Sequence, residues 1–350
     1  MRRKFATAII AIMVILPVLV MPGVSDEGGM NDTQARAINE EMMRFASQKC
    51  IRSLIEGELP SVEEISSALG YSIPEQIKAT QVSSAKNISA CVYSDITGDS
   101  INDVLVHVTI TDPVTNETST DIIALNGSDG ERLWSKSFEN CVAVALPVSD
   151  LNNDNKTDVI IEIITCLPPP PEISYGAVIV VNGCTGTEFW SEYERGEMFE
   201  IVILAGIPAN LTSAHRTDIL VTTLKINLIF GSVTSEITAK NGSNGRVLWT
   251  KSFRDNIAAG LPVDLTNDGK EEVVIASTQM GEFTMTSDVI AVNGDDGTER
   301  WRKHYLDEAF PEPAGDLTGD GANDLTVQIG CCRLEALRGD GGEVLWNMRV

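Results

Sequence analysis

The sequence is poor in positive charge. It contains 26 Lys and Arg residues against 50 Asp and Glu residues, so the formal net charge at pH 7 is −24. A surface of this sign repels nucleic acid and anionic membranes and attracts cations. We therefore expect no nucleic-acid partner and no membrane contact beyond a possible N-terminal anchor.

Histidine and motifs of catalysis are also scarce. The three histidines, His107, His215 and His304, lie far apart and show no spacing typical of metal ligands or of a catalytic triad. The sequence contains no nucleophile-elbow motif and no phosphate-binding loop motif. These absences do not favour an enzyme, although they do not identify another function.

The N-terminus has the layout of an export signal. Three basic residues precede an apolar run from Phe5 to Met21, and small residues follow at Gly23 and Ser25. We predict a signal peptide over residues 1–25, or an uncleaved anchor, and a secreted or cell-surface protein. N-glycosylation sequons fit this location and predict a glycoprotein; they begin at Asn31, Asn87, Asn116, Asn126, Asn155, Asn210 and Asn241.

Residues 26–87 differ in pattern from the rest of the chain. Apolar Ile38, Met42 and Phe45 recur at helical spacing, and a capping box runs from Ser61 to Glu64. We expect a small helical N-terminal segment, for which the sequence suggests no chemistry.

An acidic stretch recurs through the remaining residues. It reads DITGDSIND from Asp95, DLNNDNKTD from Asp150, DLTNDGKEE from Asp264 and DLTGDGAND from Asp316, with a degenerate copy, NLTSAHRTD, from Asn210. The starting residues are 52 to 60 positions apart. A period of this length is typical of propellers and other repeat arrays.

Tryptophan marks the same repeat. The chain has five tryptophans, each with a glycine four residues earlier: Trp134, Trp190, Trp249, Trp301 and Trp346. Asn-Gly turns between apolar segments predict hairpins, so that each unit contains four strands. We predict an all-β fold, a β-propeller of five four-stranded blades with tryptophan packed between blades. The blades are expected at about 88–139, 140–196, 197–254, 255–306 and 307–350.

The acidic stretches have the ligand spacing of a calcium loop. Calcium binds six to eight oxygen atoms supplied by a flexible loop, and positions 1, 3, 5 and 9 here carry oxygen-bearing side chains. The strand that follows each loop excludes an EF-hand, which requires a glutamate at position 12 and flanking helices. We predict about four Ca²⁺ sites. Their ligands are Asp95, Thr97, Asp99 and Asp103; Asp150, Asn152, Asp154 and Asp158; Asp264, Thr266, Asp268 and Glu272; and Asp316, Thr318, Asp320 and Asp324.

The degenerate third copy and one cysteine pair complete the site predictions. Asn210, Thr212, Ala214 and Asp218 retain one carboxylate, so we expect the third loop to bind no metal. Cys141 and Cys166 flank the second loop at similar distances and would lie opposite each other in a hairpin, which predicts a disulfide in an oxidising compartment. The pairing of the other five cysteines is left open.

Two family resemblances follow from these motifs over residues 88–350. The acidic loops resemble the FG-GAP repeat of integrin-type propellers, and segments such as ALNGSDGERLW resemble the tryptophan-bearing repeat of pyrroloquinoline quinone dehydrogenases and their non-catalytic relatives. These families usually have seven or eight blades, whereas five are found here. The first resemblance implies calcium in the loops. The adjacent Cys331 and Cys332 resemble a cysteine pair of the quinone enzymes, but no charged residues that would hold a quinone can be identified.

Three functions are compatible with the sequence. The leading hypothesis is a secreted or surface-held propeller that binds a protein or glycan, an adhesion module whose loops are made rigid by calcium. The alternatives are a quinone-dependent dehydrogenase-like or polysaccharide-cleaving enzyme, and a structural component of a cell envelope. The sequence does not identify the partner, the substrate or the oligomeric state.

Overall fold

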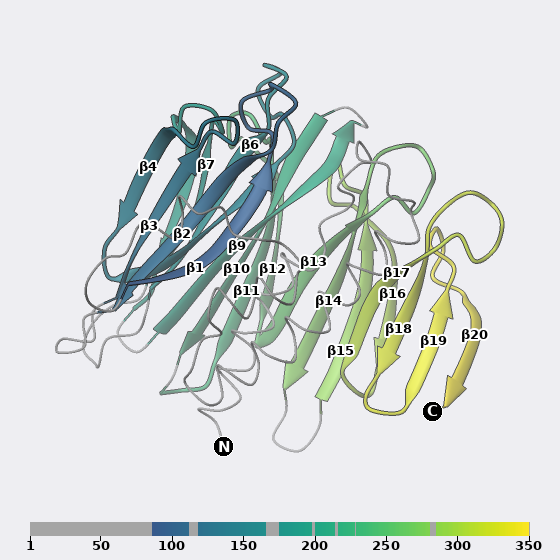
Figure 1. Ribbon diagram of the computed structural model, residues 1–350. Coiled ribbons are helices and arrows are strands. Elements are labelled where there is room, and N and C mark those ends of the chain that lie inside the picture. The colour runs from purple at the N-terminus through teal and green to yellow at the C-terminus, as the bar shows by residue number, and fades with distance from the viewer. Residues whose placement is uncertain are drawn as a thin grey trace. The chain divides into compact units, whose positions relative to one another are not determined.

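The computed structural model describes residues 86–111, 118–165, 175–197, 200–213, 216–227, 229–280 and 285–349. Throughout these ranges the regular secondary structure is β-strand, arranged as five four-stranded antiparallel sheets (Figure 1). The described part of the chain contains no helix long and apolar enough to cross a membrane. The predicted signal peptide and nearly all of the predicted helical segment lie outside the described residues.

Each sheet is formed by four consecutive strands. The first contains β1 (Lys86–Ser94), β2 (Asp103–Thr111), β3 (Thr118–Leu125) and β4 (Arg132–Phe138). The second contains β5 (Cys141–Val148), β6 (Asp158–Thr165), β7 (Tyr175–Val181) and β8 (Glu188–Arg195). The third contains β9 (Glu200–Ser213), β10 (Arg216–Asn227), β11 (Val233–Lys240) and β12 (Val247–Arg254). The fourth contains β13 (Asn256–Val263), β14 (Glu272–Met280), β15 (Met285–Val292) and β16 (Glu299–Tyr305). The fifth contains β17 (Ala309–Gly315), β18 (Asp324–Ile329), β19 (Arg333–Leu337) and β20 (Val344–Arg349).

The number and order of these strands confirm the predicted five units of four strands, and the sheets are of the kind that form propeller blades. β1 begins at Lys86, two residues before the predicted start of the first unit. Two compact units divide the chain: one contains the strands up to Ser94 and Ile101–Leu146, and the other contains Asp95–Ser100 and Pro147–Val350. Closure of the five sheets into a ring stays a prediction.

Within the second compact unit, tryptophan joins each sheet to the next. Trp249 of β12 donates its indole N–H to the carbonyl of Gly294, at 2.6 Å, and its ring lies against Gly297. A Cβ atom added to Gly297 would lie 2.8 Å from that ring, and Gly297 has a φ of +70°, so the position requires glycine for two reasons. The same contacts join Trp190 to Gly242 and Gly245, and Trp301 to Gly339 and Gly342.

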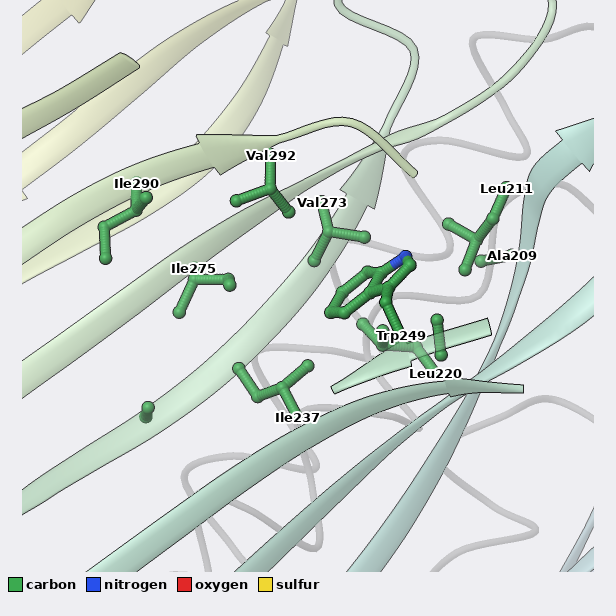
Figure 2. Packing of buried hydrophobic residues seen from close by; sticks show 11 residues of the cluster. Ala209, Leu211, Leu220, Ile237, Trp249, Val273, Ile275, Ile290 and Val292 are labelled. Carbon is green, nitrogen blue, oxygen red and sulfur yellow. The ribbon is translucent and has the colours of Figure 1, made fainter. Parts of the chain in front are cut away.

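An aliphatic residue packs beside each of these joints. It is position 2 of the acidic loop: Leu151 contacts Gly242, Leu211 contacts Gly294, and Leu265 contacts Gly339. Figure 2 shows Trp249 with Leu211, Leu220 and Val273 around it, in a core made by the third and fourth sheets. One Asn-Gly turn therefore receives both a tryptophan and an aliphatic side chain from the preceding sheet, which explains why glycines recur at fixed spacing from the tryptophans.

The fifth sheet differs at both of these positions. Trp346 is 43% exposed and Leu317 is 45% exposed, whereas Trp249 is 8% exposed and Leu211 is fully buried. All of β20 is exposed. The expectation that all five tryptophans are buried between blades is therefore wrong for Trp346, because no following turn covers it in the described structure.

The first strand of a sheet has a free edge, and in β5 and β13 this edge is capped by polar side chains of the preceding sheet. Thr120 on β3 donates its hydroxyl to the carbonyl of Cys141 and accepts the N–H of Ala143, both at 3.2 Å. Ser235 on β11 makes the same pair of contacts with Asn256 and Ala258. Because a strand edge presents amides that must find acceptors, these hydroxyls satisfy groups that no strand pairs.

In the first two sheets a second capping residue lies on the second strand. His107 accepts the N–H of Ala145 at 3.2 Å, and Glu162 accepts the N–H of Gly206 at 2.7 Å. Ala276 occupies the corresponding position in the fourth sheet and cannot accept a hydrogen bond. When the repeats are aligned, Pro311 on β17 takes the position equivalent to Gly206, and a proline there has no N–H that needs an acceptor.

Both titratable caps have pKa values displaced by burial. Burial lowers the pKa of His107 to about 4, so the ring is neutral and can accept the amide hydrogen. Burial raises the pKa of Glu162 from its ordinary value of 4.5 to about 7, against the opposing effect of the hydrogen bond from Gly206. Neither residue belongs to a catalytic arrangement among the described residues.

We expect Trp249→Ala to lower the free energy of unfolding by about 3–5 kcal/mol, because it removes a buried ring and leaves a cavity between two sheets. Urea denaturation of the full chain measures this loss. The matched variant is Trp346→Ala. A loss below about 1 kcal/mol shows that the fifth sheet is uncovered in solution; a loss similar to that of Trp249→Ala shows that another turn covers it, as ring closure requires. A mild effect of both variants would contradict the joint described above.

Glu162→Gln should abolish a pH dependence of stability. Because the folded state holds the proton of Glu162 more tightly than the unfolded state, its contribution is complete below about pH 4.5 and is lost as the pH rises through about 7. The variant should therefore be more stable than the native chain at pH 8 and should differ little at pH 4.5. Thermal melts across this range measure the difference, with the exposed Glu131→Gln as control. An unchanged pH profile would show that Glu162 is not the group responsible.

Candidate metal loops

The four acidic loops share one backbone conformation. Positions 4 and 6 have positive φ: Gly98 and Ser100 in the first loop, Asn153 and Asn155 in the second, and the equivalent Asn or Gly residues in the fourth and fifth. Only Gly, Asn and a few other residues adopt this conformation at low cost. The alternation of carboxylates with Gly and Asn therefore shapes a loop that wraps tightly around its first residue.

The carboxylate at position 1 is the centre of each wrap. Asp316 accepts the N–H groups of Gly319, Asp320 and Gly321, at 2.6 to 3.2 Å. Asp95, Asp150 and Asp264 accept three backbone N–H groups of their own loops in the same way. A carboxylate has about four lone-pair sites, so acceptor capacity remains for a cation.

Position 9 serves a different purpose. Asp158 is fully buried; its Oδ2 accepts the N–H of Leu151 at 2.8 Å and its Oδ1 accepts the N–H of Gly183 at 3.2 Å. Asp324 joins Leu317 to Gly339 in the same manner, at 2.8 and 3.0 Å. The carboxylate at position 9 thus ties the acidic loop to the Asn-Gly turn of its own sheet, a structural role that the sequence analysis did not assign.

In the second loop a buried carboxylate, Asp158, lies close to two other carboxylates. Burial, followed by the charges of Asp154 and Asp150, raises the pKa of Asp158 to about 6, against the hydrogen bonds from Leu151 and Gly183. From the neighbouring glycine turn, Asp154 receives a neutral amide: Asn182 donates to Asp154 Oδ2 at 3.0 Å. Asn152 also donates to Asp154, at 3.0 Å. These neighbours supply hydrogen bonds but no positive charge.

In the fifth loop an arginine takes the place of that amide. Arg338, at the turn position equivalent to Asn182, places its guanidinium 2.8 Å from Asp320 Oδ2 and 2.9 Å from Asp340. Hydrogen bonds from the loop and the charge of Arg338 hold the pKa of Asp320 below its usual range. In the fourth loop Arg300 lies 3.7 Å from Glu272, whose pKa is raised mainly by burial.

The third copy has lost the loop conformation. β9 continues to Ser213 and β10 begins at Arg216, so that a tight hairpin replaces the acidic wrap. Asp218, at position 9, is still fully buried and accepts the N–H and hydroxyl of Thr212. Its other oxygen, Oδ1, has no hydrogen-bond partner within the described residues. Position 9 therefore keeps its contact with the preceding strand, at Thr212, but not the hydrogen bond to the turn, and the carboxylates of positions 1 and 5 are lost.

The predicted ligand sets are only partly brought together. In the described ranges, no group of three or more Asp, Glu, His or Cys side chains lies in an arrangement that could hold a metal ion. Thr266 and Thr318, at position 3, contact Glu272 at 3.5 Å and Asp316 at 3.4 Å. Asp95, Thr97 and Asp99 belong to one compact unit and Asp103 to the other, where Asp103 is buried and accepts the N–H of Gly127.

The predicted disulfide is not tested. Cys141 is buried at the start of β5, and Cys166 lies outside the described residues. Sequence reasoning also missed Asn182, Arg338 and Arg300 as neighbours of the loops. The first two could have been found from the repeat, since they occupy the first position of the turn that precedes each tryptophan.

Comparison with solved structures gives only weak likenesses. BBS1N, in its complex with ARL6DN soaked with lead, is 8% identical and has a TM-score of 0.29 over 75% of this chain and 84% of that chain. Sqt1 of Saccharomyces cerevisiae is 10% identical, with a TM-score of 0.22 over 69% of this chain and 81% of that one. TM-scores this low support no conclusion about fold or function. Among curated proteins no sequence matches the chain.

A family model identifies the repeats more firmly. The model described as outer membrane protein assembly factor BamB, PQQ_2, matches residues 174–350, which is just over half of the chain and includes the last four tryptophan-bearing turns. The tryptophan and glycine contacts described above recur in these repeats. The chain therefore belongs to the PQQ_2 family, that of the outer membrane protein assembly factor BamB.

Proposed function

We propose that this protein is an exported, calcium-binding propeller-repeat protein that binds a protein or glycan partner along the sheet edges formed by its acidic loops and Asn-Gly turns. One observation carries the proposal: a buried carboxylate at position 9 ties the second and the fifth acidic loops to the turns beside them, as Asp158 ties Leu151 to Gly183 and Asp324 ties Leu317 to Gly339. Loops held in this way form a rigid surface for recognition, because their binding costs little conformational entropy.

The exposed side chains of this edge define the partner's chemistry. Carboxylates project from both components of the edge, from the loops at Asp99, Asp154 and Asp268 and from the turns at Asp129 and Asp295. A surface of this kind attracts a basic protein surface, or a glycan whose hydroxyl groups share a bound cation. Membership of the PQQ_2 family supports a propeller module that interacts with other proteins. Export and an envelope location rest on the N-terminal signal and on the outer-membrane name of the family.

Calcium fits the second loop best. Burial raises the pKa of Asp158, and the neighbouring Asp154 and Asp150 add to this effect. No arginine pairs with these carboxylates in the described structure, so a divalent cation would relieve their repulsion. Asp150, Asn152, Asp154 and Asp158 would hold the ion, as the likeness to FG-GAP repeats suggests. In the fourth and fifth loops Arg300 and Arg338 already supply positive charge, and we infer weaker binding there.

The ion would act mainly on stability and rigidity. A ligand that binds only the folded state stabilises it by about 2.7 kcal/mol per site at a hundredfold excess over Kd. This gain is large beside the total stability of a typical domain, of order 10 kcal/mol. Calcium bound to the second loop would also fix the edge against which a partner docks.

The two best-defined loops allow a matched test of calcium binding. Asp154→Asn should remove one calcium ion from the full chain, because it removes a ligand charge from the second loop. Arg338→Gln should strengthen binding at the fifth loop, because it frees Asp320 from its guanidinium partner. Isothermal titration calorimetry with Ca²⁺ measures both changes. Affinity at the second loop should fall as the pH drops through about 6, where Asp158 takes up a proton.

The control separates a specific ion from simple screening. Chelation should lower the melting temperature of the native chain, and the shift should be smaller in Asp154→Asn. High salt screens carboxylate repulsion without filling a calcium site. If salt with chelator restores the full melting temperature, or if no heat of binding is found at about 1 mM Ca²⁺, the loops are acidic turns and the calcium proposal is wrong.

Partner binding is tested by comparing the two ends of the sheets. Arrays of glycans and of envelope proteins from the producing organism would be probed with the native chain, in calcium and in chelator. Replacing Asp295 and Asp340 together by Asn should abolish the signal. Leu306→Ser, a change at the opposite end of the fourth sheet, should leave it intact. Binding that survives the double replacement but fails in Leu306→Ser would place recognition at the other end.

A further inference from the structure

Two adjacent cysteines occupy the turn between β18 and β19. The Sγ atoms of Cys331 and Cys332 are 2.9 Å apart, and both side chains are exposed. Of the other cysteines whose side chains the structure describes, Cys141 is buried and Cys184 is half-buried, with its Sγ 3.7 Å from Lys156 Nζ. The pair on the β18–β19 turn is therefore the accessible thiol site of the described chain.

A backbone hydrogen bond holds the first residue of the turn, and the two cysteine side chains are exposed. Gly330, with a φ of +53°, donates its N–H to the carbonyl of Glu308 at 2.9 Å, and the Asp307 carboxylate lies against it. The next strand begins with Arg333, which pairs in register with Arg349 on β20. The hydrogen bond with Cys331 raises the pKa of the Cys332 thiol, Asp307 adds to this effect, and Arg349 opposes it.

We propose that Cys331 and Cys332 form a thiol–disulfide exchange site, which reacts with a small-molecule disulfide and closes reversibly into a disulfide between the two adjacent residues. The site lies outside the acidic loops and does not depend on calcium. It is a modification site with a defined co-reactant, since a disulfide of low molecular weight supplies the oxidising equivalents.

The reaction balances in two steps. The thiolate of Cys331 attacks one sulfur of the external disulfide, forms a mixed disulfide and releases the first small thiol. The thiolate of Cys332 then attacks the sulfur of Cys331, which closes the internal disulfide and releases the second small thiol. Two protons pass from the protein thiols to the two departing thiolates. The order agrees with the raised pKa of Cys332, which results from its hydrogen bond to Cys331 and the charge of that neighbour.

The closed form should be easily reduced. A disulfide between neighbouring residues closes a small ring that contains one peptide bond, and the planar peptide resists the geometry that a relaxed disulfide adopts. Strained and exposed disulfides are the labile ones, which open again when small thiols are in excess. The pair therefore fits a reversible site better than a permanent crosslink.

The test uses the reduced full chain and glutathione disulfide as probe. Trypsin releases one peptide, from His304 to Arg333, that contains both cysteines and no other. In the native chain this peptide should lose the mass of two hydrogens and carry no adduct, and excess reduced glutathione should restore its mass. Cys332→Ser should instead retain one glutathione on Cys331, because the second step is blocked. Cys184→Ser is the control and should react like the native chain.

Other products would overturn the proposal. Glutathione adducts that persist on the native peptide would show that the two cysteines react independently. A crosslink from this peptide to another peptide or to a second chain would show that the closest reactive partner is a different cysteine. An unchanged peptide would show that the thiols do not exchange, and a closed form that reduced glutathione cannot reopen would contradict reversibility.

Discussion

The glycine turn that ends the third strand of each repeat is the feature on which the second compact unit depends. It must receive the tryptophan of the preceding sheet and, beside it, an aliphatic side chain from the preceding acidic loop. Both contacts require glycine, because a side chain would collide with the packed residue: Trp190 lies against Gly245, and Leu151 lies against Gly242. A buried ring and a buried aliphatic group each contribute several kcal/mol, so one turn concentrates much of the free energy that joins two sheets.

The acidic loops are coupled to these joints through the chain itself. Leu151 is held between Asp150, whose carboxylate organises the loop backbone, and the contact with Gly242. Asp158 accepts the N–H of Leu151 and so fixes the backbone of this aliphatic residue. The loop can therefore serve the packing of the sheets without any ion, and a bound cation would reinforce contacts that already exist. This coupling explains why the third copy keeps a buried Asp218 in a hairpin that has lost the rest of the pattern.

The sequence was sufficient to predict the five four-stranded units because each has its own markers. Tryptophan, glycine and aspartate recur at offsets that only a repeated local structure would keep. The turn position of Arg338 and Asn182 recurs in the sequence, but their contacts with Asp320 and Asp154 depend on how the hairpins bring the end of β19 or β7 beside the acidic loop that precedes it. The exposure of Trp346 was also missed, because the spacing of glycine and tryptophan within a repeat is the same whether or not the turn of another sheet covers the ring. The ligand arrangement predicted for calcium depends on side-chain positions that spacing alone does not determine.

Hydrogen bonds from a side chain of one sheet to the first strand of the next restrict how such a chain can change during evolution. The acceptor lies on one sheet and the amide on the next, as with Glu162 and Gly206. The equivalent positions of the fourth and fifth sheets hold Ala276, which has no acceptor, and Pro311, which has no amide hydrogen. A whole sheet that is duplicated or moved would gain a new neighbour, and its side-chain acceptors would no longer correspond to the backbone N–H groups of that neighbour. An alanine placed beside a strand with an ordinary amide, for example, would leave a buried donor without an acceptor. A duplicated segment keeps each acceptor and its amide together only if it begins within one sheet and ends within the next. The segment that can be duplicated without loss is therefore offset from the four-stranded repeat that the sequence shows.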